Sequence, residues 1–149
     1  MLANSPFDIN LGLIPANPPD TYNDQYTTTR SEQDAIENWL ATVCNHNSAD
    51  IVKLYANEGV LLGTVAKEMK VGRSKIKEYF DMFVKKKPCG EITSMNVQRY
   101  GDMAVVDGTY TFEMNVNGGR EEVPARYTFV LRKKNHRWLI VSHHSSAQP

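Results

Sequence analysis

The residues best suited to chemistry lie in one short run near the end of this 149-residue sequence, His143-His144-Ser145-Ser146. They close a segment with the pattern of a β-strand, and side chains alternate between the two faces of a strand. His143 and Ser145 therefore share one face, and His144 and Ser146 share the other. An imidazole beside a hydroxyl suits general acid–base catalysis or the orientation of a water molecule. The pattern fits equally well one buried, hydrogen-bonded histidine and one exposed histidine.

The apolar residues before this run do not tell which of its two faces looks inward. Strict alternation places Leu139 and Val141 on the face of His143. The opposite face then receives Trp138 and Ile140. Both faces are apolar, so periodicity alone leaves the inward pair open.

A zinc site and a nucleophilic serine both lack their usual sequence patterns. The other histidines, His46 and His136, fall in a predicted helix-ending turn and a hairpin tip, and no H-x-H or H-E-x-x-H spacing is present. A site in which carboxylates bind another kind of ion remains an open alternative. The sequence has no G-x-S-x-G elbow. Ser145 lies two residues along the strand from His143, which places both side chains on one face but does not align the hydroxyl for nucleophilic attack.

Further polar candidates come from segments predicted to face the last strand. Thr64 follows a short apolar strand, at the expected mouth of the pocket. Tyr79 lies on the apolar stripe of a predicted helix, where it is either an amphipathic core residue or a hydroxyl that needs a partner. Three more candidates on long strands are Tyr110, Arg126 and Tyr127.

Apolar residues at helical spacing predict three helices in the first part of the chain. The first begins after Ser31, an N-cap residue with Asp34 three positions later. The second is short and capped by Ser48, and a brief strand follows at residues 59–62. The third helix carries the clearest stripe, formed by Ile76, Tyr79, Phe80 and Phe83.

After residue 90 the periodicity changes from helical to alternating. Turn signals separate four predicted consecutive strands at residues 91–100, 103–116, 121–132 and 137–145. Helices followed by an antiparallel meander predict an α+β fold, in which N-terminal helices wrap a cone-shaped, curved antiparallel sheet. Such a cone encloses an apolar pocket, the usual setting of a ligand site.

Composition excludes several classes of protein. Seventeen basic and seventeen acidic residues balance to a net charge of zero, which argues against a nucleic-acid partner. No stretch approaches the roughly 20 apolar residues of a membrane span, so no membrane partner is expected. Cys44 and Cys89 form neither a disulfide framework nor a C-x-x-C metal motif, and we expect buried free thiols.

The first thirty residues differ from the rest in being rich in proline and polar residues. They predict an extended arm over residues 1–30, followed by one α+β domain over residues 31–149. The arm lacks the basic and long apolar regions of a signal peptide. The compartment stays open, with plastid or periplasm among the options if a targeting segment has been removed.

The order of elements and the C-terminal residues resemble the association-domain branch of the ketosteroid-isomerase-like cone superfamily, which includes the hub domain of calmodulin-dependent kinase II. The run H-H-S-S-x-x-P at His143–Pro149 is more specifically similar to the iota-class carbonic anhydrases of bacteria and algae. Leu61–Thr64 and Ile76–Phe80 match other recurrent segments of that class. The resemblance covers residues 31–149, and Gly63 stands where a proline is expected, which makes that turn less rigid.

This resemblance implies reversible hydration of CO₂ to bicarbonate. Members of the class are described as metal-free or as associated with manganese, and we expect no cofactor here, with manganese as the runner-up. The residues carried over to the pocket are Thr64, Tyr79, His143 and Ser145. His143 has the pKa range to take or relay a proton, and the hydroxyls would orient water and stabilise the developing bicarbonate.

The expected assembly is a homodimer formed through the sheet. The main alternative is a non-catalytic association or ligand-binding module that forms oligomers. A third option is isomerase or cyclase chemistry on a larger apolar ligand. That chemistry needs a carboxylate base inside the cone, and the sequence identifies no clear inward Asp or Glu on the last strands.

Overall fold

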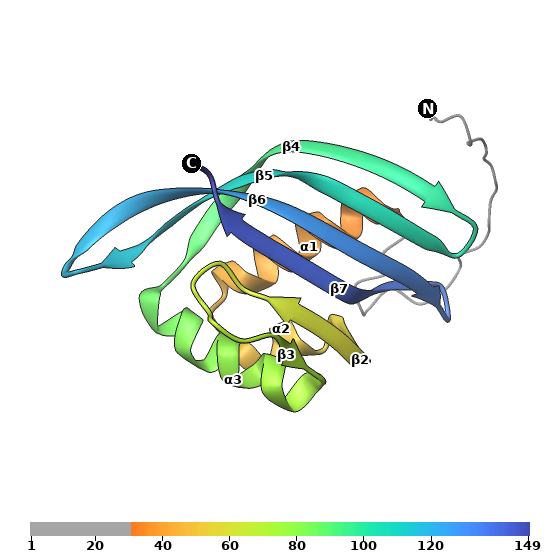
Figure 1. Cartoon of the computed structure of the whole chain (residues 1–149), viewed down its shortest axis with the longest axis horizontal. Helices are drawn as coiled ribbons and strands as arrows, with labels where there is room; N and C mark the ends of the chain where they lie inside the picture. Colours follow the sequence, from red (N-terminus) through yellow and green to blue (C-terminus); the bar gives the residue numbers. More distant parts are fainter. Residues whose placement is uncertain (1–30) are drawn as a thin grey trace.

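The computed structural model describes residues 31–149, and the extended arm predicted over residues 1–30 lies outside them. Figure 1 shows the long strands side by side, with the helices gathered near one part of the sheet. The predicted α+β class with N-terminal helices is confirmed. The elements are α1 (Glu32–Cys44), α2 (Ser48–Val52), β2 (Tyr55–Leu62), β3 (Lys70–Val71), α3 (Arg73–Phe83), the 3₁₀ helix η1 (Val84–Lys86), β4 (Cys89–Tyr100), β5 (Met103–Val116), β6 (Gly119–Lys134) and β7 (Arg137–Ala147).

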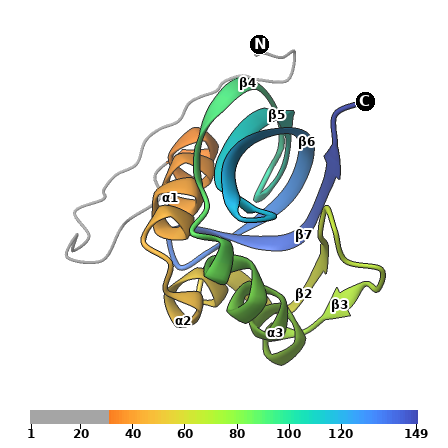
Figure 2. The same cartoon turned by 90° about the vertical axis from the view of Figure 1, so that its left-hand side faces the viewer.

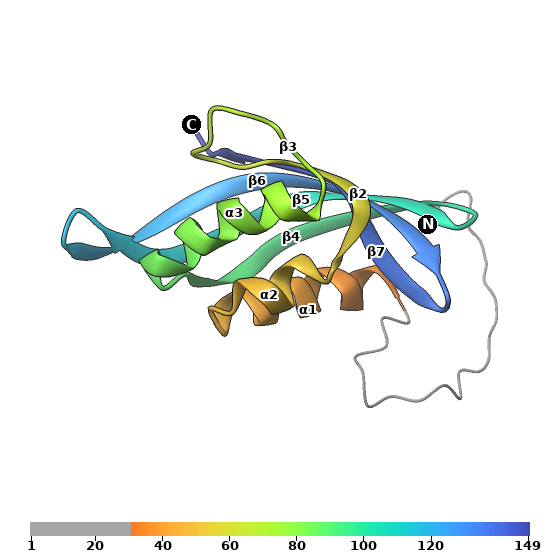
Figure 3. The same cartoon turned by 90° about the horizontal axis from the view of Figure 1, so that it is seen from below.

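The six strands form one sheet in the order β3-β2-β7-β6-β5-β4. Strands β4 to β7 make the predicted antiparallel meander, but β2 pairs with β7 in parallel, so the sheet is not wholly antiparallel. The long strands twist, and the sheet curls without closing (Figure 2). Seen from below, α1, α2 and α3 run across one face of the sheet (Figure 3). This curved shell is the cone-like body that the sequence predicts.

Helices α1 and α3 follow the predicted apolar spacing. The side chain of Ser31 caps α1 by accepting a hydrogen bond from the backbone N–H of Asp34 at 3.0 Å. None of the described helices is long and apolar enough to cross a membrane. The stripe of α3 faces the sheet, with two of its residues fully buried and two partly buried: Ile76, Phe80, Tyr79 and Phe83.

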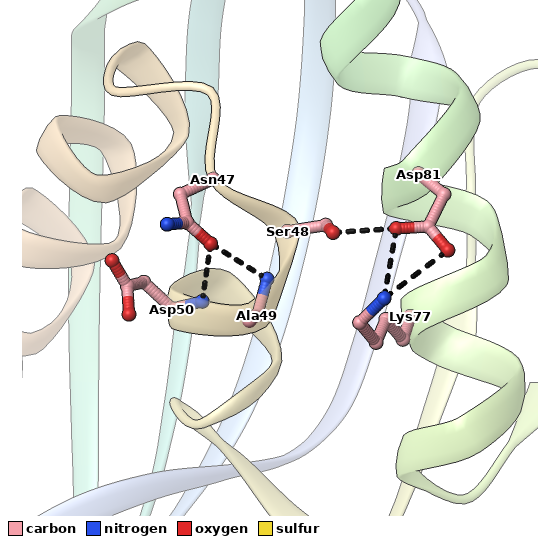
Figure 4. Close-up of polar contacts among 6 residues, drawn as sticks. All are labelled: Asn47, Ser48, Ala49, Asp50, Lys77 and Asp81. Atoms are coloured by element: carbon pink, nitrogen blue, oxygen red, sulfur yellow. Dashed lines mark hydrogen bonds and ion pairs between the residues drawn. The ribbon is translucent and has the colours of Figure 1, made fainter.

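The cap of α2 lies one residue earlier than predicted. Asn47 is the N-cap, and its side-chain oxygen accepts hydrogen bonds from the backbone N–H groups of Ala49 and Asp50 at 3.0 Å and 3.2 Å. The hydroxyl of Ser48 instead donates to Asp81 on α3 (Figure 4). The predicted cap at Ser48 is therefore wrong, because this side chain joins two helices rather than closing one.

Strand β7 departs from strict alternation at one residue. Its register against β6 shifts after Ile140, which makes Val141 an extra residue in the strand, a β-bulge. Trp138 and Ile140 are consequently buried on the same side as His143. The prediction that Leu139 and Val141 share the face of His143 is wrong, because the bulge exchanges the faces ahead of the histidine.

The two cysteines are not free thiols. Cys44 at the end of α1 and Cys89 at the start of β4 form a disulfide, with their Cα atoms 4.4 Å apart. The expectation from sequence is wrong because α1 ends beside the start of β4. A separation of 45 residues along the chain does not reveal that proximity.

Candidate functional site

An apolar cavity of about 250 Å³ lies between α3 and the concave face of the sheet. Its walls are mostly aromatic and aliphatic, and its few polar residues include Thr64 and Ser145. Apolar cavities with a few polar groups are typical ligand sites. Its lining consists of Trp39, Leu61, Gly63, Thr64, Val65, Tyr79, Phe80, Phe83, Lys86, Tyr110, Phe112, Met114, Val116, Glu121, Val123, Ala125, His143 and Ser145.

Three hydroxyl groups and one imidazole form a connected hydrogen-bonded cluster in this cavity. The hydroxyl oxygens of Thr64 and Ser145 are 2.6 Å apart. The hydroxyl of Tyr110 donates to Ser145 at 2.7 Å and lies 3.2 Å from Nε2 of His143. The parallel register of β2 and β7 sets Leu61 opposite His143, which brings the residues after β2 beside Ser145.

Two further groups extend the cluster into the core. The hydroxyl of Tyr55 lies 2.9 Å from Nδ1 of His143, and the indole N–H of Trp39 donates to that hydroxyl at 3.1 Å. The ring of Phe129 stacks on the imidazole, with a centroid distance of 3.9 Å. Both nitrogens of His143 therefore have partners, and its ring is fixed by an aromatic neighbour. We call the six residues of this cluster the polar chain: Trp39, Tyr55, His143, Tyr110, Ser145 and Thr64.

Burial keeps the titratable groups of the polar chain uncharged. Desolvation, with a smaller contribution from the neighbouring His144, lowers the pKa of His143 to about 3. Burial raises the pKa of Tyr55 and of Tyr110, so both remain protonated. This disagrees with the expectation that His143 has the pKa range to take a proton, because an imidazole whose pKa is about 3 is a weak base at physiological pH.

Tyr79 faces the same cavity but is joined to it differently. Burial raises its pKa to about 12, and a hydrogen bond with the backbone of Thr64 acts in the opposite direction. Its ring lies so close to Gly63 that a Cβ there would approach the ring carbons Cε2 and Cζ to 2.3 Å and 2.5 Å. Glycine at position 63 is therefore the residue that this position of Tyr79 requires.

All four residues carried over by resemblance line the one cavity: Thr64, Tyr79, His143 and Ser145. Among the other candidates on long strands, only Tyr110 joins them. Tyr127 is buried but donates to the carbonyl of Ser94 at 2.9 Å, and Arg126 lies on the outer face near Ser146.

The remaining histidines take no part in the cavity. His144 is exposed on the outer face of β7, and its strand partner there is Thr128. The Nε2 atom of His46 lies 2.8 Å from the carbonyl oxygen of Pro88. His136 belongs to the β6–β7 turn, as the sequence indicates.

Sequence reasoning missed four residues of the site. Trp39 and Tyr55 show only the apolar pattern of core residues, and no sequence signal marks their hydrogen bonds. Lys86 and Glu121 also line the cavity. The sequence identifies no inward carboxylate on the last strands, and Glu121 on β6 corrects that point.

The donor set of the cavity does not fit a manganese ion. Mn²⁺ prefers carboxylate, carbonyl and water oxygens in octahedral geometry. Among the described residues, Glu121 is the only carboxylate in the cavity lining, and no group of three or more His, Cys, Asp or Glu could hold a metal ion. The polar groups of the cavity are suited instead to binding a small polar molecule or a water.

Comparison with known proteins identifies related sequences and folds. Residues 31–149 match the family model described as the calcium/calmodulin dependent protein kinase II association domain. A structure provisionally described by the same name, from Xanthomonas campestris, is 38% identical, with a TM-score of 0.76, covering 91% of this chain and 99% of that chain. No curated protein matches the chain.

Two more distant structures show a likeness of fold alone. The CamKII hub homology domain of Chlamydomonas reinhardtii is 24% identical, with a TM-score of 0.66, and covers 78% of this chain and 95% of that chain. A ketosteroid isomerase-like protein from Erwinia carotovora is 19% identical, also with a TM-score of 0.66, and covers 86% of this chain and 100% of that chain.

The neutral state of His143 predicts a specific dependence of stability on pH. Its pKa is about 3 in the fold and near 6.5 when the chain is unfolded, so between these values the unfolded chain binds a proton that the folded chain does not. The contribution of His143 to the free energy of unfolding is fully present above about pH 6.5 and decreases as the pH falls towards 3. Urea unfolding should show the advantage of wild type over His143→Gln narrowing from about pH 7 to about pH 4. An advantage that does not change with pH would contradict the neutral imidazole.

The close contact of Gly63 with Tyr79 predicts that even one methyl group there is harmful. We expect Gly63→Ala to push the Tyr79 ring out of the cavity and to lower the free energy of unfolding by about 1–3 kcal/mol. Gly119→Ala is the matched control, because a Cβ at that position meets nothing within 4 Å. Urea denaturation and a crystal structure of each variant provide the measurement. A Gly63→Ala protein as stable as wild type, with Tyr79 unmoved, would contradict this geometry.

Proposed function

The chain belongs to the calcium/calmodulin dependent protein kinase II association domain family, and within that family we propose that its cavity is a metal-independent carbonic anhydrase site of the iota class. One observation carries the proposal. The four residues that the resemblance implies for CO₂ hydration come from three separate segments, yet they line a single apolar cavity: Thr64, Tyr79, His143 and Ser145. Three of them belong to the cluster of hydroxyls and imidazole, and Tyr79 contacts the backbone of Thr64.

The walls of the cavity suit CO₂ as a substrate. CO₂ has no net dipole and is poorly hydrated, so an apolar wall accepts it without a desolvation cost. Aromatic rings from α3 and β5 provide that wall, among them Phe80, Phe83 and Phe112. The hydroxyls of Thr64 and Ser145 provide hydrogen-bonding groups at one place in this apolar wall, where CO₂ and water would react.

The reaction uses these hydroxyls to stabilise charge on oxygen. A water oxygen attacks the carbon of CO₂, and one C=O electron pair moves onto an oxygen that accepts a hydrogen bond from the hydroxyl cluster. This arrangement acts as an oxyanion hole. Bicarbonate forms when the attacking water loses one proton, so the balance is CO₂ + H₂O → HCO₃⁻ + H⁺.

The proton does not go to His143. That imidazole is buried and neutral with a pKa of about 3, so it holds the geometry of Tyr110 rather than acting as the base. Glu121 is the only carboxylate in the cavity lining among the described residues, and it is exposed to solvent. We assign the transfer of the proton to water and Glu121.

The two serines of the C-terminal run provide the test of this site. Ser145→Ala removes a hydroxyl from the cavity and should lower kcat for CO₂ hydration by about 100-fold, the usual effect of losing one group that stabilises an oxyanion. Ser146→Ala is the matched control, because Ser146 lies on the outer face and accepts from Arg126 at 3.4 Å. Stopped-flow hydration assays with both variants measure the difference.

The same assay tests the independence from metal. Activity should survive treatment with strong chelators, because the cavity offers hydroxyls and a neutral imidazole rather than a set of carboxylates. In the serine comparison, an equal loss of kcat in Ser145→Ala and Ser146→Ala would contradict the assignment of the reaction to this cavity. Activity that disappears on chelation and returns with one ion, such as manganese, would contradict the metal-independent mechanism.

A second candidate function is association of subunits through the outer face of the sheet. The helices cover the other face (Figure 3), and the outer face carries half-buried aliphatic residues. Val105 on β5 is paired with Val130 on β6, and Val130 is paired with Ser142, which in turn lies opposite Val60 on β2. A row of this kind across four strands suits burial against a second copy of the chain in a two-fold dimer.

A charge in the middle of this row should prevent association. We expect Val130→Asp to be monomeric where wild type is dimeric, because the carboxylate would be buried without a partner. Met82→Asp is the control, since Met82 is exposed on α3, which covers the opposite face of the sheet. Sedimentation velocity measures the size of each protein. A wild-type monomer, or a Val130→Asp protein that stays dimeric, would contradict association through this face.

A further inference from the structure

The polar chain has one end that can only donate a hydrogen bond. It runs through six side chains from the core to the cavity, with successive donor–acceptor distances of 3.1, 2.9, 3.2, 2.7 and 2.6 Å: Trp39, Tyr55, His143, Tyr110, Ser145 and Thr64. Each hydroxyl has a single proton, and a neutral imidazole has one N–H and one acceptor nitrogen. The direction of one hydrogen bond therefore determines the direction of the next.

The indole N–H of Trp39 sets that direction at the closed end. An indole has no acceptor, so Tyr55 must accept from it and has its own proton left to donate. The partner for that proton is Nδ1 of His143. An accepting Nδ1 leaves the imidazole proton on Nε2, which is the nitrogen that faces Tyr110.

The remaining bonds follow in the same direction. The Nε2–H of His143 donates to the oxygen of Tyr110, and the hydroxyl of Tyr110 donates to Ser145. Ser145 is buried, so its proton goes to Thr64, the neighbouring oxygen at 2.6 Å. Thr64 is half-exposed and lines the cavity, and its proton is the one left to point inward.

The opposite direction conflicts with burial. A proton on Nδ1 would make Tyr55 accept from both His143 and Trp39, and the proton of Tyr55 would have no acceptor in a fully buried position. An unsatisfied buried donor is costly. The reversed chain would also make Thr64 an acceptor toward the cavity, so the two directions give the site opposite preferences.

We infer that Trp39 and Tyr55 are positioning residues that hold His143 as its Nε2–H tautomer, so that Thr64 presents a hydrogen-bond donor to the cavity. The site then offers one oriented hydrogen-bond donor to an acceptor oxygen of the ligand. Under the proposed function, on which the identity of the ligand rests, that acceptor is the oxygen of CO₂ that becomes negative in bicarbonate. The low pKa of His143 agrees with this assignment, because a neutral ring has a defined tautomer.

The tautomer of His143 can be measured directly on the full chain. Nitrogen-15 NMR distinguishes a protonated from an unprotonated imidazole nitrogen, and the His143 signals are those lost in His143→Gln. We expect wild type at neutral pH to show protonation at Nε2 alone. Tyr55→Phe removes the donor to Nδ1, and the Nδ1–H form should then appear. Tyr127→Phe is the matched control, since Tyr127 is also buried but donates to the carbonyl of Ser94, outside the polar chain.

The outcomes separate this inference from the proposed function. A wild-type His143 protonated on Nδ1, or on both nitrogens, overturns the inference even if CO₂ is hydrated. A Tyr55→Phe protein with an unchanged tautomer overturns the role of Tyr55. Protonation at Nε2 in wild type, together with the Nδ1–H form in Tyr55→Phe, supports the inference whether or not CO₂ is hydrated.

An activity assay adds a second readout under the proposed function. Tyr55→Phe should lower kcat for CO₂ hydration by about tenfold with little change in KM, because the donor acts on charge that develops in the transition state. Tyr127→Phe should leave kcat unchanged. Equal effects in the two variants would overturn the positioning role, since both remove one buried hydroxyl.

Discussion

The structure depends on a neutral imidazole that is buried on the concave face of the sheet with both of its nitrogens hydrogen-bonded. An unpaired nitrogen at that depth would be costly, so the partners of His143 are constraints on the fold. Tyr55 on β2 satisfies Nδ1, and Tyr110 on β5 satisfies Nε2. The bulge at Val141 turns the histidine inward in the first place.

These constraints bring distant segments to one end of a single cavity. The parallel pairing of β2 with β7 sets Leu61 opposite His143, and Thr64 follows within hydrogen-bond distance of Ser145. Helix α1 adds Trp39, and α3 closes the cavity with Tyr79 against Gly63. The same interactions that satisfy buried polar groups therefore also build the proposed site, which links the stability of the fold to its chemistry.

The sequence predicts the parts of this arrangement that local patterns encode. Apolar spacing predicts α1 and α3, alternation predicts β4 to β7, and strand geometry pairs His143 with Ser145. The sequence does not reveal the bulge at Val141, because residues 138–141 are all apolar and a shift of one residue leaves no mark in their pattern. Nor does it reveal the disulfide or the bond from Trp39 to Tyr55, since each joins segments that meet only in the folded chain.

The central claim is that a cavity of hydroxyls around a neutral imidazole hydrates CO₂ without a metal. Its most direct test is oxygen-18 exchange between labelled CO₂ and water at chemical equilibrium, followed by membrane-inlet mass spectrometry on metal-stripped protein. We predict exchange well above the rate in buffer, with no increase when Mn²⁺ or Zn²⁺ is added. Exchange at the buffer rate, or exchange that requires one of these ions, would contradict it.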